Sequence, residues 1–223
     1  MSQGEYQRKV KAMEQEQRAQ ELFHICGSKP EDAQAFKSLY RSGDEQVFDS
    51  DGYNVLHMAA EHGQLEILQH LIECGVDVNT PNKTNLNKPV VYGVYGGVKA
   101  LEMLLKAGAS TEPHPDAGDK VSALHRAAEN NDGCIELLCE AGADVHAVDI
   151  NGMTALHSAA CCFNLEACKA LIHHGADSDA MDDYGRTARG IYAPLASLLI
   201  ANEISSGIEP ETTKAAKRNF SPI

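Results

Sequence analysis

The sequence has no tryptophan, and aromatic residues make up only 5% of its 223 residues. This composition is lean for a large core and is common where small side chains pack many short helices. No apolar run reaches 18 residues, so no membrane span is expected, and the polar N-terminus gives no sign of a secretion signal. Because the net charge is −13, a nucleic-acid partner is not expected, and a protein partner with a basic face is favoured.

Motifs for catalysis and metal binding are also missing. The seven cysteines form no CxxC pair. Their odd number without a secretion signal indicates reduced thiols inside the cell, and most of them are expected to be small buried side chains. There is no HExxH motif, and the glycine-rich residues 93–99 lack the GxxxxGK[ST] spacing that cradles a phosphate. We therefore expect no enzymatic activity, no cofactor and no bound metal.

What the sequence does contain is one unit written several times. NGMTALHSAA at 151–160, followed by LIHHGAD at 171–177, recurs as DGYNVLHMAA at 51–60 with LIECGVD at 71–77. A third copy reads SALHRAA at 122–128 with EAGAD at 140–144. Glycines close the units with spacings of 32, 33, 34 and 33, at Gly43, Gly75, Gly108, Gly142 and Gly175. Glycine readily takes the left-handed conformation that ends a helix.

Each unit also has a side chain that can cap the start of its first helix. These residues are Asn54, Asn87, Ser122, Thr154 and Thr187. Their oxygen atoms can accept hydrogen bonds from the amides of the first helical turn. The helices so started are two or three turns long, which is too short for stability alone in water. They must therefore stack on neighbouring units.

The period near 33 and the runs TALH and SALH resemble the ankyrin repeat, whose signature is T-P-L-H-x-A. The resemblance covers about residues 19–203. It implies an all-α solenoid of stacked helix-turn-helix units with projecting β-hairpin loops and a concave groove. The expected units are 19–50, 51–83, 84–117, 118–150, 151–183 and 184–203, the first and last being caps. A polar and potentially helical extension at 1–18 precedes them, and a disordered tail at 204–223 follows.

The unit at 84–117 departs most from the signature. It reads NKPV at 87–90, which puts Val90 in the place of the histidine. Glycines interrupt its first helix, and a glycine inside a helix costs about 1 kcal/mol, so we expect a looser or distorted helix. The loop at 111–119 is two residues longer than the others. The last unit loses Leu-His, and its helices are expected to be shortened around Pro194.

The resemblance implies a structural role for the signature histidines, His57, His125 and His157. In the family this imidazole binds neighbouring loop backbone and ties consecutive repeats together. The resemblance also implies that partners contact the hairpin tips and the inner side of the first helices. Two rows of residues are expected to face that groove. The residues before the cap are Tyr53, Leu86, Val121, Met153 and Arg186, and those after the histidine position are Met58, Val91, Arg126, Ser158 and, in the last cap, Ile191.

An apolar strip on a protein surface often marks an interaction site, and the first row is apolar except for Arg186. With Tyr92 and Tyr95 added, we expect a groove rich in Tyr and Met with an acidic rim. The alternative is that these side chains merely cover neighbouring loops. The context of Asn79, in DVN at 77–79, resembles the ankyrin site that the oxygen-sensing hydroxylase of animals modifies; the alternative there is a simple hairpin hydrogen bond.

The resulting prediction is a monomeric, intracellular interaction module, either cytoplasmic or nuclear. It would act as an adaptor, a scaffold or an inhibitory subunit for a protein partner that the sequence does not identify. Two alternatives remain open. One is a regulatory subunit of a transcriptional or cell-cycle complex, and the other is a bacterial effector that imitates host ankyrin proteins.

Overall fold

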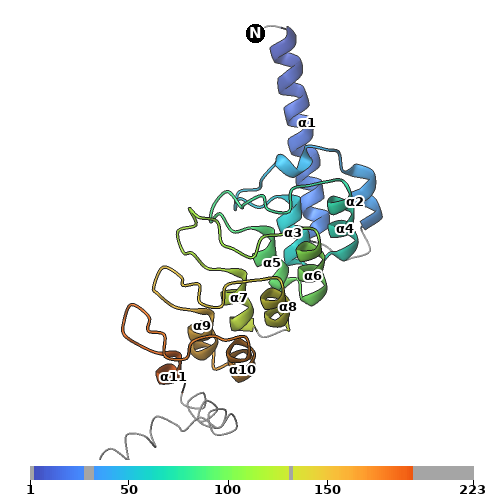
Figure 1. Ribbon diagram of the computed structural model, residues 1–223. Helices are drawn as coiled ribbons and strands as arrows, with labels where there is room; N and C mark the ends of the chain where they lie inside the picture. The colour runs from blue at the N-terminus through green and yellow to red at the C-terminus, as the bar shows by residue number, and fades with distance from the viewer. Residues whose placement is uncertain (1–2, 28–32, 131–132, 193–223) are drawn as a thin grey trace, which may run out of the picture.

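The computed structural model describes residues 3–27, 33–130 and 133–192 of the chain. In these residues pairs of helices stack on one another, and long loops project to one side of the stack (Figure 1). The first helices of the pairs are α1 (Gln3–Cys26), α3 (Val55–Glu61), α5 (Pro89–Tyr95), α7 (Ala123–Asn130), α9 (Ala155–Cys161) and α11 (Ala188–Ile191). The second helices are α2 (Ala33–Leu39), α4 (Leu65–Glu73), α6 (Val98–Lys106), α8 (Cys134–Glu140) and α10 (Leu165–His173).

Two rows of helices build the stack, since each first helix contacts the next first helix and each second helix contacts the next second helix. A short 3₁₀ helix, η2 (Asp44–Gln46), precedes α3. The projecting loops are hairpins whose described residues carry only isolated bridges, Val148 to Thr154 and Met181 to Thr187. The predicted all-α solenoid is confirmed.

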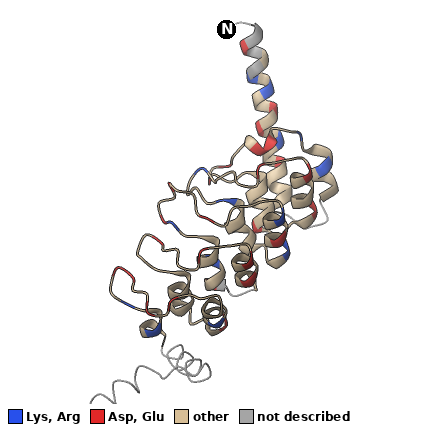
Figure 2. Cartoon of the chain, in the orientation of Figure 1, with Lys and Arg blue, Asp and Glu red and all other residues tan. Residues whose placement is uncertain are grey.

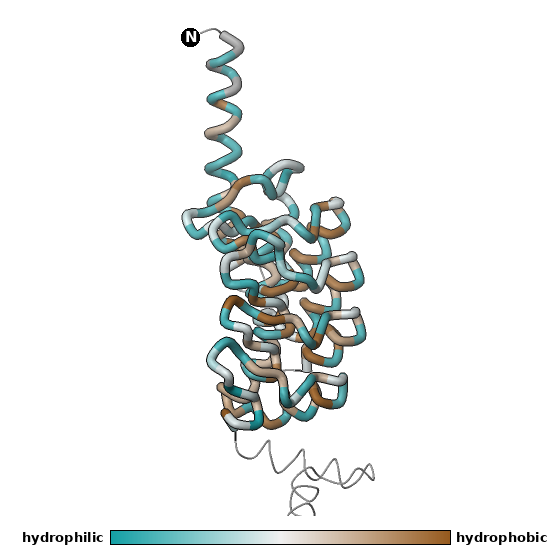
Figure 3. Tube along the Cα trace, turned by 60° about the vertical axis from the view of Figure 1, so that its left-hand side comes forward, coloured by the Kyte–Doolittle hydropathy of each residue, from teal (hydrophilic) through white to brown (hydrophobic). Residues whose placement is uncertain are grey.

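The core lies between the two rows and consists mainly of leucine and alanine. Leu56, Leu124 and Leu156 of the first helices are buried, as are the leucines of the second helices that face them. The pair of alanines that ends each clear signature, such as Ala59 and Ala60, has no exposed surface. Small side chains there let successive first helices approach closely. Figure 3 shows hydrophobic and hydrophilic segments alternating along each stacked unit, whereas the projecting part of α1 is mostly hydrophilic.

Four of the five closing glycines end a second helix in the same way. Gly75, Gly108, Gly142 and Gly175 have φ between 76° and 91°. In each case the glycine N–H donates to the carbonyl three residues back, and the next N–H donates to the carbonyl five residues back. This is the Schellman pattern. Gly43 differs, because α2 already ends at Leu39 and Gly43 instead precedes η2.

The predicted caps hold in the units with a clear signature. Asn54 accepts hydrogen bonds from the backbone N–H groups of Leu56 and His57, while the His57 ring accepts one from the Asn54 N–H. Thr154 and His157 form the same reciprocal arrangement. The cap predicted at Asn87 is wrong, because α5 begins at Pro89 and its N-cap is Lys88.

The reason is a one-residue shift in the unit at 84–117. A backbone hydrogen bond closes three of the hairpins over four residues, for example Asp149 N–H to Met153 O at 2.9 Å, but closes the hairpin before α5 over five residues, from Asn82 to Asn87, at 2.8 Å. The turn between α5 and α6 then has two residues, 96–97, where that between α3 and α4 has three, 62–64. The extra residue in the hairpin and the missing residue in the turn cancel each other, so the spacing of the closing glycines does not reveal them. In helical register Val91, not Val90, occupies the place of the histidine.

The expected looseness of α5 is also wrong. It is a seven-residue α-helix like α3 and α9. Its glycines allow close packing: a Cβ on Gly96 would lie 1.9 Å from the carbonyl oxygen of Ala60 and 2.9 Å from the Gly63 nitrogen. A Cβ on Gly93 would lie 2.7 Å from Leu104 Cδ1. The glycines of this unit are therefore the points where α5 contacts its neighbours.

The N-terminal helix α1 crosses the expected boundary at residue 18 without a break, and its first half projects beyond the stack (Figure 1). Within the stack its Ala19, Leu22 and Cys26 are buried. The side chain of Arg18 binds both carboxylate oxygens of Asp44, at 2.9 and 3.0 Å, and the Asp44 side chain is almost fully buried. This pair connects α1 to η2.

Other expectations concern the chain ends and the thiols. Pro194 and residues 204–223 lie outside the described residues.

Three cysteines are buried, Cys26, Cys134 and Cys168, but Cys74, Cys161 and Cys162 are exposed, so the expectation that most are buried is wrong. The loop between α6 and α7 spans 107–122, which is two residues more than 141–154 between α8 and α9 but only one more than 74–88 between α4 and α5, so the prediction of two extra residues holds against the later loop alone. In the described chain, no helix combines the length and the apolar character that crossing a bilayer requires.

Candidate functional site

Two of the three signature histidines connect their own unit to the next one. The Nδ1 atom of His125 accepts from the Ser122 N–H at 3.3 Å, and its Nε2–H donates to the carbonyl oxygen of Met153 at 2.9 Å. His157 repeats the arrangement with Thr154 and with the carbonyl oxygen of Arg186, at 3.1 Å. Both imidazoles are buried. Each therefore ties a helix start to the following hairpin.

His57 is the exception, because its neighbour is the shifted unit. Its Nδ1 accepts from Asn54, but its buried Nε2 has no hydrogen-bond partner among the described residues. Burial lowers the pKa of His57 to about 4. The carbonyl oxygens of Asn87 and Thr80 lie close enough to oppose this shift in part, although neither reaches hydrogen-bond geometry. Asn87 is the residue equivalent to Met153, so the missing bond follows from the inserted residue.

Aromatic rings fill the space beside His57. The ring of Tyr92 meets the imidazole edge to face, with centroids 5.2 Å apart, and lies 4.9 Å from the ring of Tyr53. The Tyr92 hydroxyl donates to the side chain of Asn85 at 3.1 Å. Burial raises the pKa of Tyr92 well above its usual value. Tyr92 is thus a packing residue that replaces the lost histidine contact, and it is nearly inaccessible to a partner.

The buried neutral state of His57 predicts a pH-dependent stability. In the unfolded chain His57 binds a proton near pH 6.5, but in the folded chain it binds one only near pH 4. The free energy of unfolding therefore falls as the pH drops between these values. From pH 7 to pH 5 this loss amounts to about 2 kcal/mol. A His57→Gln variant keeps an acceptor for the Asn54 N–H, as glutamine does at this position of a capping box, but cannot titrate. Urea unfolding at several pH values should show a flatter curve for the variant. Parallel curves for the two proteins would contradict the assignment.

The structure shifts both predicted rows by one residue in the unit at 84–117. In the row after the histidine, the equivalent of Met58 and Arg126 is Tyr92, and Val91 is buried in the place of the histidine, so Val91 is not available to a partner. In the row before the cap, the equivalent of Tyr53 and Met153 is Asn87 instead of Leu86. The backbone of Leu86 is left-handed, with φ 60°, and its N–H donates to Asn82 O at 3.0 Å.

The other predicted residues differ in how much of each is accessible. Ser158 is buried, which leaves little of it for a partner. The remaining members of the two rows are half-buried or exposed, namely Tyr53, Met58, Val121, Arg126, Met153, Arg186 and Ile191. Arg186 is largely committed to the buried carboxylate of Asp182, which it binds at 2.7 Å.

The accessible part of the predicted groove centres on Tyr95, which is 47% exposed. Glu61 of α3 and Glu129 of α7 occupy the same helical position as Tyr95, and Met58 and Arg126 lie one turn before them. We call these five residues the inner face. Arg126 pairs with Glu129 at 3.1 Å. Burial raises the pKa of Tyr95, and the charges of Arg126, Glu129 and Glu61 all act on its hydroxyl, which indicates that these four residues lie together.

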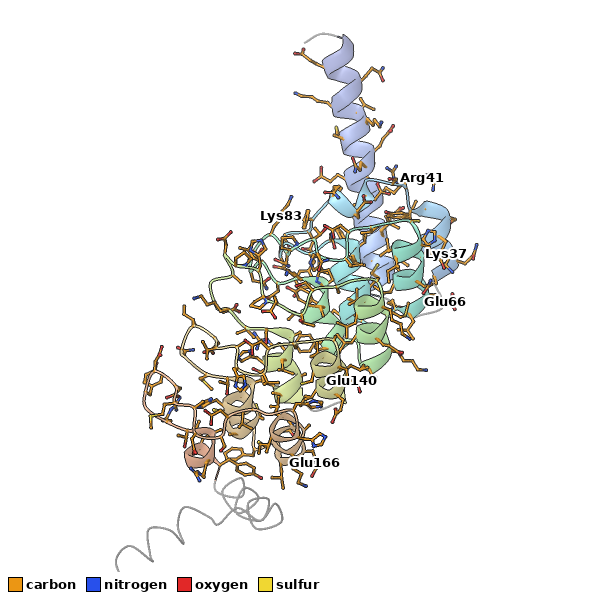
Figure 4. The ribbon with its side chains drawn as sticks, in the orientation of Figure 1. Lys37, Arg41, Glu66, Lys83, Glu140 and Glu166 are labelled. Carbon is orange, nitrogen blue, oxygen red and sulfur yellow. The ribbon has the colours of Figure 1, made fainter. Side chains whose placement is uncertain are left out.

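The opposite surface, formed by the second helices, is charged. Lys37 of α2 lies 3.7 Å from Glu66 of α4, and Lys169 pairs with Glu166 on α10 at 2.6 Å. Figure 4 shows Lys37, Glu66, Glu140 and Glu166 along this side. Exposed ion pairs of this kind are typical of a solvated surface and contribute little to stability. The inner face is therefore the better candidate for binding.

Sequence reasoning missed a group of exposed apolar residues in the last two complete units and the hairpin that follows them. Phe163, with φ 56°, ends the turn after α9, and its ring contacts that of Tyr192 at 5.5 Å. The other four, Val148, Ile150, Met181 and Tyr184, lie on the last two described hairpins. They stand outside the two rows taken from the family, so their only signal was the presence of large apolar residues in loops.

Asn79 bridges two hairpins. Its side chain donates to the carbonyl oxygen of Gly108 at 3.1 Å and accepts from the Ser110 N–H at 2.7 Å. Both ends of the amide are therefore in use, and hydroxylation of Asn79 stays a prediction. In residues 3–27, 33–130 and 133–192, no group of three or more His, Cys, Asp and Glu residues is arranged to hold a metal ion.

Comparison with known proteins follows this geometry. The family model described as ankyrin repeats (3 copies) matches residues 22–115, 93–182 and 124–204. These overlapping matches cover most of the chain. They include every helix described above except the part of α1 before residue 22.

Several curated proteins are similar to the chain over part of its length. Neurogenic locus notch homolog protein 2 of Homo sapiens is 30% identical over 137 residues, which is 60% of this chain and 6% of that protein. Neurogenic locus notch homolog protein 1 of Xenopus tropicalis is 29% identical over 140 residues, 62% of this chain and 6% of that protein. Nuclear factor NF-kappa-B p105 subunit of Gallus gallus is 30% identical over 152 residues, 64% of this chain and 15% of that protein. The chain therefore matches only a small part of each relative.

Proposed function

Because this chain belongs to the ankyrin-repeat family, we propose that it is a protein-interaction module whose inner face binds a segment of a protein partner. Ankyrin repeats generally mediate interactions between proteins and are generally not enzymes. The observation that carries the proposal is Tyr95, a large side chain that is half-exposed beside the pair of Arg126 and Glu129. Tyrosine and arginine are enriched at the centres of protein interfaces. The module acts as an adaptor, a scaffold or an inhibitory subunit.

The charge of the protein favours a partner with basic groups. Glu61 and Glu129 flank Tyr95, and Asp and Glu residues are spread over the hairpins beside it (Figure 2). The whole chain carries a formal charge of −13. Opposite charge on the partner would accelerate association and help to set its orientation. We place this activity inside the cell and assign it to the monomer.

A second candidate function is that of a regulatory subunit in a transcriptional complex. What favours it is the similarity to a relative that is named as a subunit of a nuclear factor. Because the chain matches only 15% of that protein, this candidate rests on the repeats alone. It predicts that the partner is a nuclear protein.

The proposed function is tested by affinity capture from the cell that makes the protein. A Met58→Asp/Tyr95→Asp variant places two further carboxylates on the inner face. Proteins enriched by the native chain should decline by at least about tenfold with this variant, the effect expected when an interface centre is lost. The matched control is Lys169→Glu, which alters the surface of the second helices and should leave capture unchanged.

Circular dichroism and urea unfolding establish that both variants are folded. If the same proteins are captured in the same amounts by the native chain and by the folded inner-face variant, the proposal for this surface is wrong. Identification of the captured proteins by mass spectrometry separates the two candidate functions.

A further inference from the structure

The last two described hairpins expose a group of large apolar side chains. Eight large hydrophobic residues are exposed in the described parts of the chain, and four of them lie here. We call these four the hairpin strip: Val148 (49% exposed), Ile150 (61%), Met181 (69%) and Tyr184 (71%). Neighbouring apolar residues left in water on a soluble protein mark an interaction surface more often than single ones do.

The strip is formed by two hairpins that contact each other. The Asp183 N–H donates to the carbonyl oxygen of Asn151 at 3.0 Å, which joins the two loops. Val148 and Met181 occupy equivalent places, because each pairs with the threonine that caps the following helix. At the same place in earlier hairpins stand Phe48, whose ring is covered by the ammonium group of Lys83 at 4.0 Å, then Pro81 and Asp116. The strip thus belongs to the C-terminal end of the stack alone.

Carboxylates without counter-charges surround the strip. On these two hairpins Asp144, Asp149, Asp177 and Asp183 form no ion pair with any described residue. Two other carboxylates, those of Asp179 and Asp182, are paired with arginines. A segment that fits this surface must offer large apolar side chains together with positive charge.

The chain itself contains such a segment. Residues 212–223 read TTKAAKRNFSPI, with three basic residues, no acidic residue, and Phe220 and Ile223 close behind the charges. The last described residue, Tyr192, directly follows α11, the helix that the hairpin with Met181 and Tyr184 leads into. The 21 residues at 193–213 can span up to roughly 70 Å when extended, which exceeds the length of a hairpin. We propose that residues 214–223 bind the hairpin strip of their own chain.

Attachment to the same chain makes even a weak contact effective. Covalent attachment gives the segment a local concentration on the order of 1 mM. An intrinsic dissociation constant of about 0.5 mM would then leave the strip covered for about two-thirds of the time. The basic residues would lie against the four carboxylates that form no ion pair with a described residue, and Phe220 and Ile223 against Met181 and Tyr184. This proposal concerns a different surface from the inner face and does not depend on it.

Methionine oxidation tests the proposal on the full chain. Met181 lies in the strip, and Met13, at the opposite end of the molecule, is similarly exposed at 62%, so it serves as an internal reference. Brief exposure to hydroxyl radicals followed by peptide mass spectrometry gives the ratio of the two oxidation rates. In a variant with Lys214→Glu, Lys217→Glu, Arg218→Glu and Phe220→Ser this ratio should rise about threefold, because the coverage is lost. A Glu209→Gln/Glu211→Gln variant is the matched control and should keep the low ratio.

Each other outcome of this experiment decides against the proposal. An equal ratio in the native chain and the basic-segment variant would show that the strip is not covered by residues 214–223. Protection of Met181 that disappears when the protein is diluted from 100 to 1 μM would assign the contact to a second copy. The Met58→Asp/Tyr95→Asp variant should retain the low ratio, so that failure of the inner-face proposal and failure of this one can be told apart.

Discussion

Replacement of Gly96 by alanine is expected to lower the free energy of unfolding by about 3 kcal/mol, the upper end of the usual cost of overpacking. The φ of Gly96 is −71°, which alanine adopts without strain. The cost comes instead from the added Cβ, which would lie 1.9 Å from the carbonyl oxygen of Ala60 and 2.9 Å from the nitrogen of Gly63. Both atoms belong to the backbone, so no side-chain rotation can relieve the clash, and α3 and α5 must move apart. Urea unfolding measures the effect.

Gly118→Ala is the matched control for this change. Nothing lies within 4 Å of the position of its Cβ, and its φ is not left-handed, so the free energy of unfolding should change by less than about 0.5 kcal/mol. Gly93→Ala should fall between the two, because the atom that its Cβ would meet is the flexible tip of Leu104. An effect of Gly96→Ala as small as that of Gly118→Ala would contradict the close contact between α3 and α5.

Replacement of Arg18 is the second change that is expected to lower the free energy of unfolding by a large amount. An Arg18→Met variant keeps a side chain of similar length but removes both hydrogen bonds to Asp44, whose carboxylate then stays buried without its charge partner. Removing one member of a buried ion pair costs about 3–5 kcal/mol, and the partial exposure of Arg18 places this change near 3 kcal/mol. Hydrogen exchange should show the loss first in α1 and η2, which the pair connects.

Two further variants identify the cause of that loss. Asp44→Asn in the Arg18→Met background removes the buried charge and should restore part of the stability. Arg189→Met breaks an exposed pair with Asp179 and should cost no more than about 0.5 kcal/mol. Equal losses in Arg18→Met and Arg189→Met would show that the burial of Asp44 is not what makes the first pair important.

The fold could be predicted from the sequence because its signals are local and repeated. A capping residue such as Thr154, the histidine three residues later and the closing Gly175 each perform their role through bonds within one unit or to the next one. Wherever the signature is intact, the predicted helix pairs agree with the structure, and the predicted histidine bonds form for His125 and His157 but not for His57, which precedes the shifted unit.

The shifted register could not be predicted, because it leaves no trace in the glycine spacing. One extra residue before Asn87 and one fewer at Gly96 and Gly97 preserve the period of 33. The prediction therefore assigned Val90 to the histidine position, Asn87 to the cap and Leu86 and Val91 to the binding rows. Glycines were interpreted by their low helix propensity. Only the three-dimensional contact between α5 and α3 shows that Gly96 is required there.

The candidate site was predicted in part for a similar reason. The rows taken from the family identified Met58 and Arg126, and the separately added Tyr95 joins them, since all three have accessible surface that a partner can use. The rows also included Ser158, and the second added tyrosine was Tyr92, both of which neighbouring units bury. Burial depends on the next repeat in the stack, which a row of equivalent positions does not describe. The hairpin strip required knowledge of which loop residues remain in water.

The compensated insertion and deletion also limit where this protein can be recombined with its relatives. Suppose that a homologous repeat replaced only the hairpin before α5. The donor's hairpin, closed over four residues, would then be joined to the turn after α5, which is one residue short. As a result every side chain of α5 would rotate by about 100° about the helix axis. A donor fragment that carries both the hairpin and the turn would leave the helical phase intact. For this chain the exchangeable module is therefore the stretch from Asn82 to Gly97 taken whole, which is half a repeat away from the boundary that its glycines suggest.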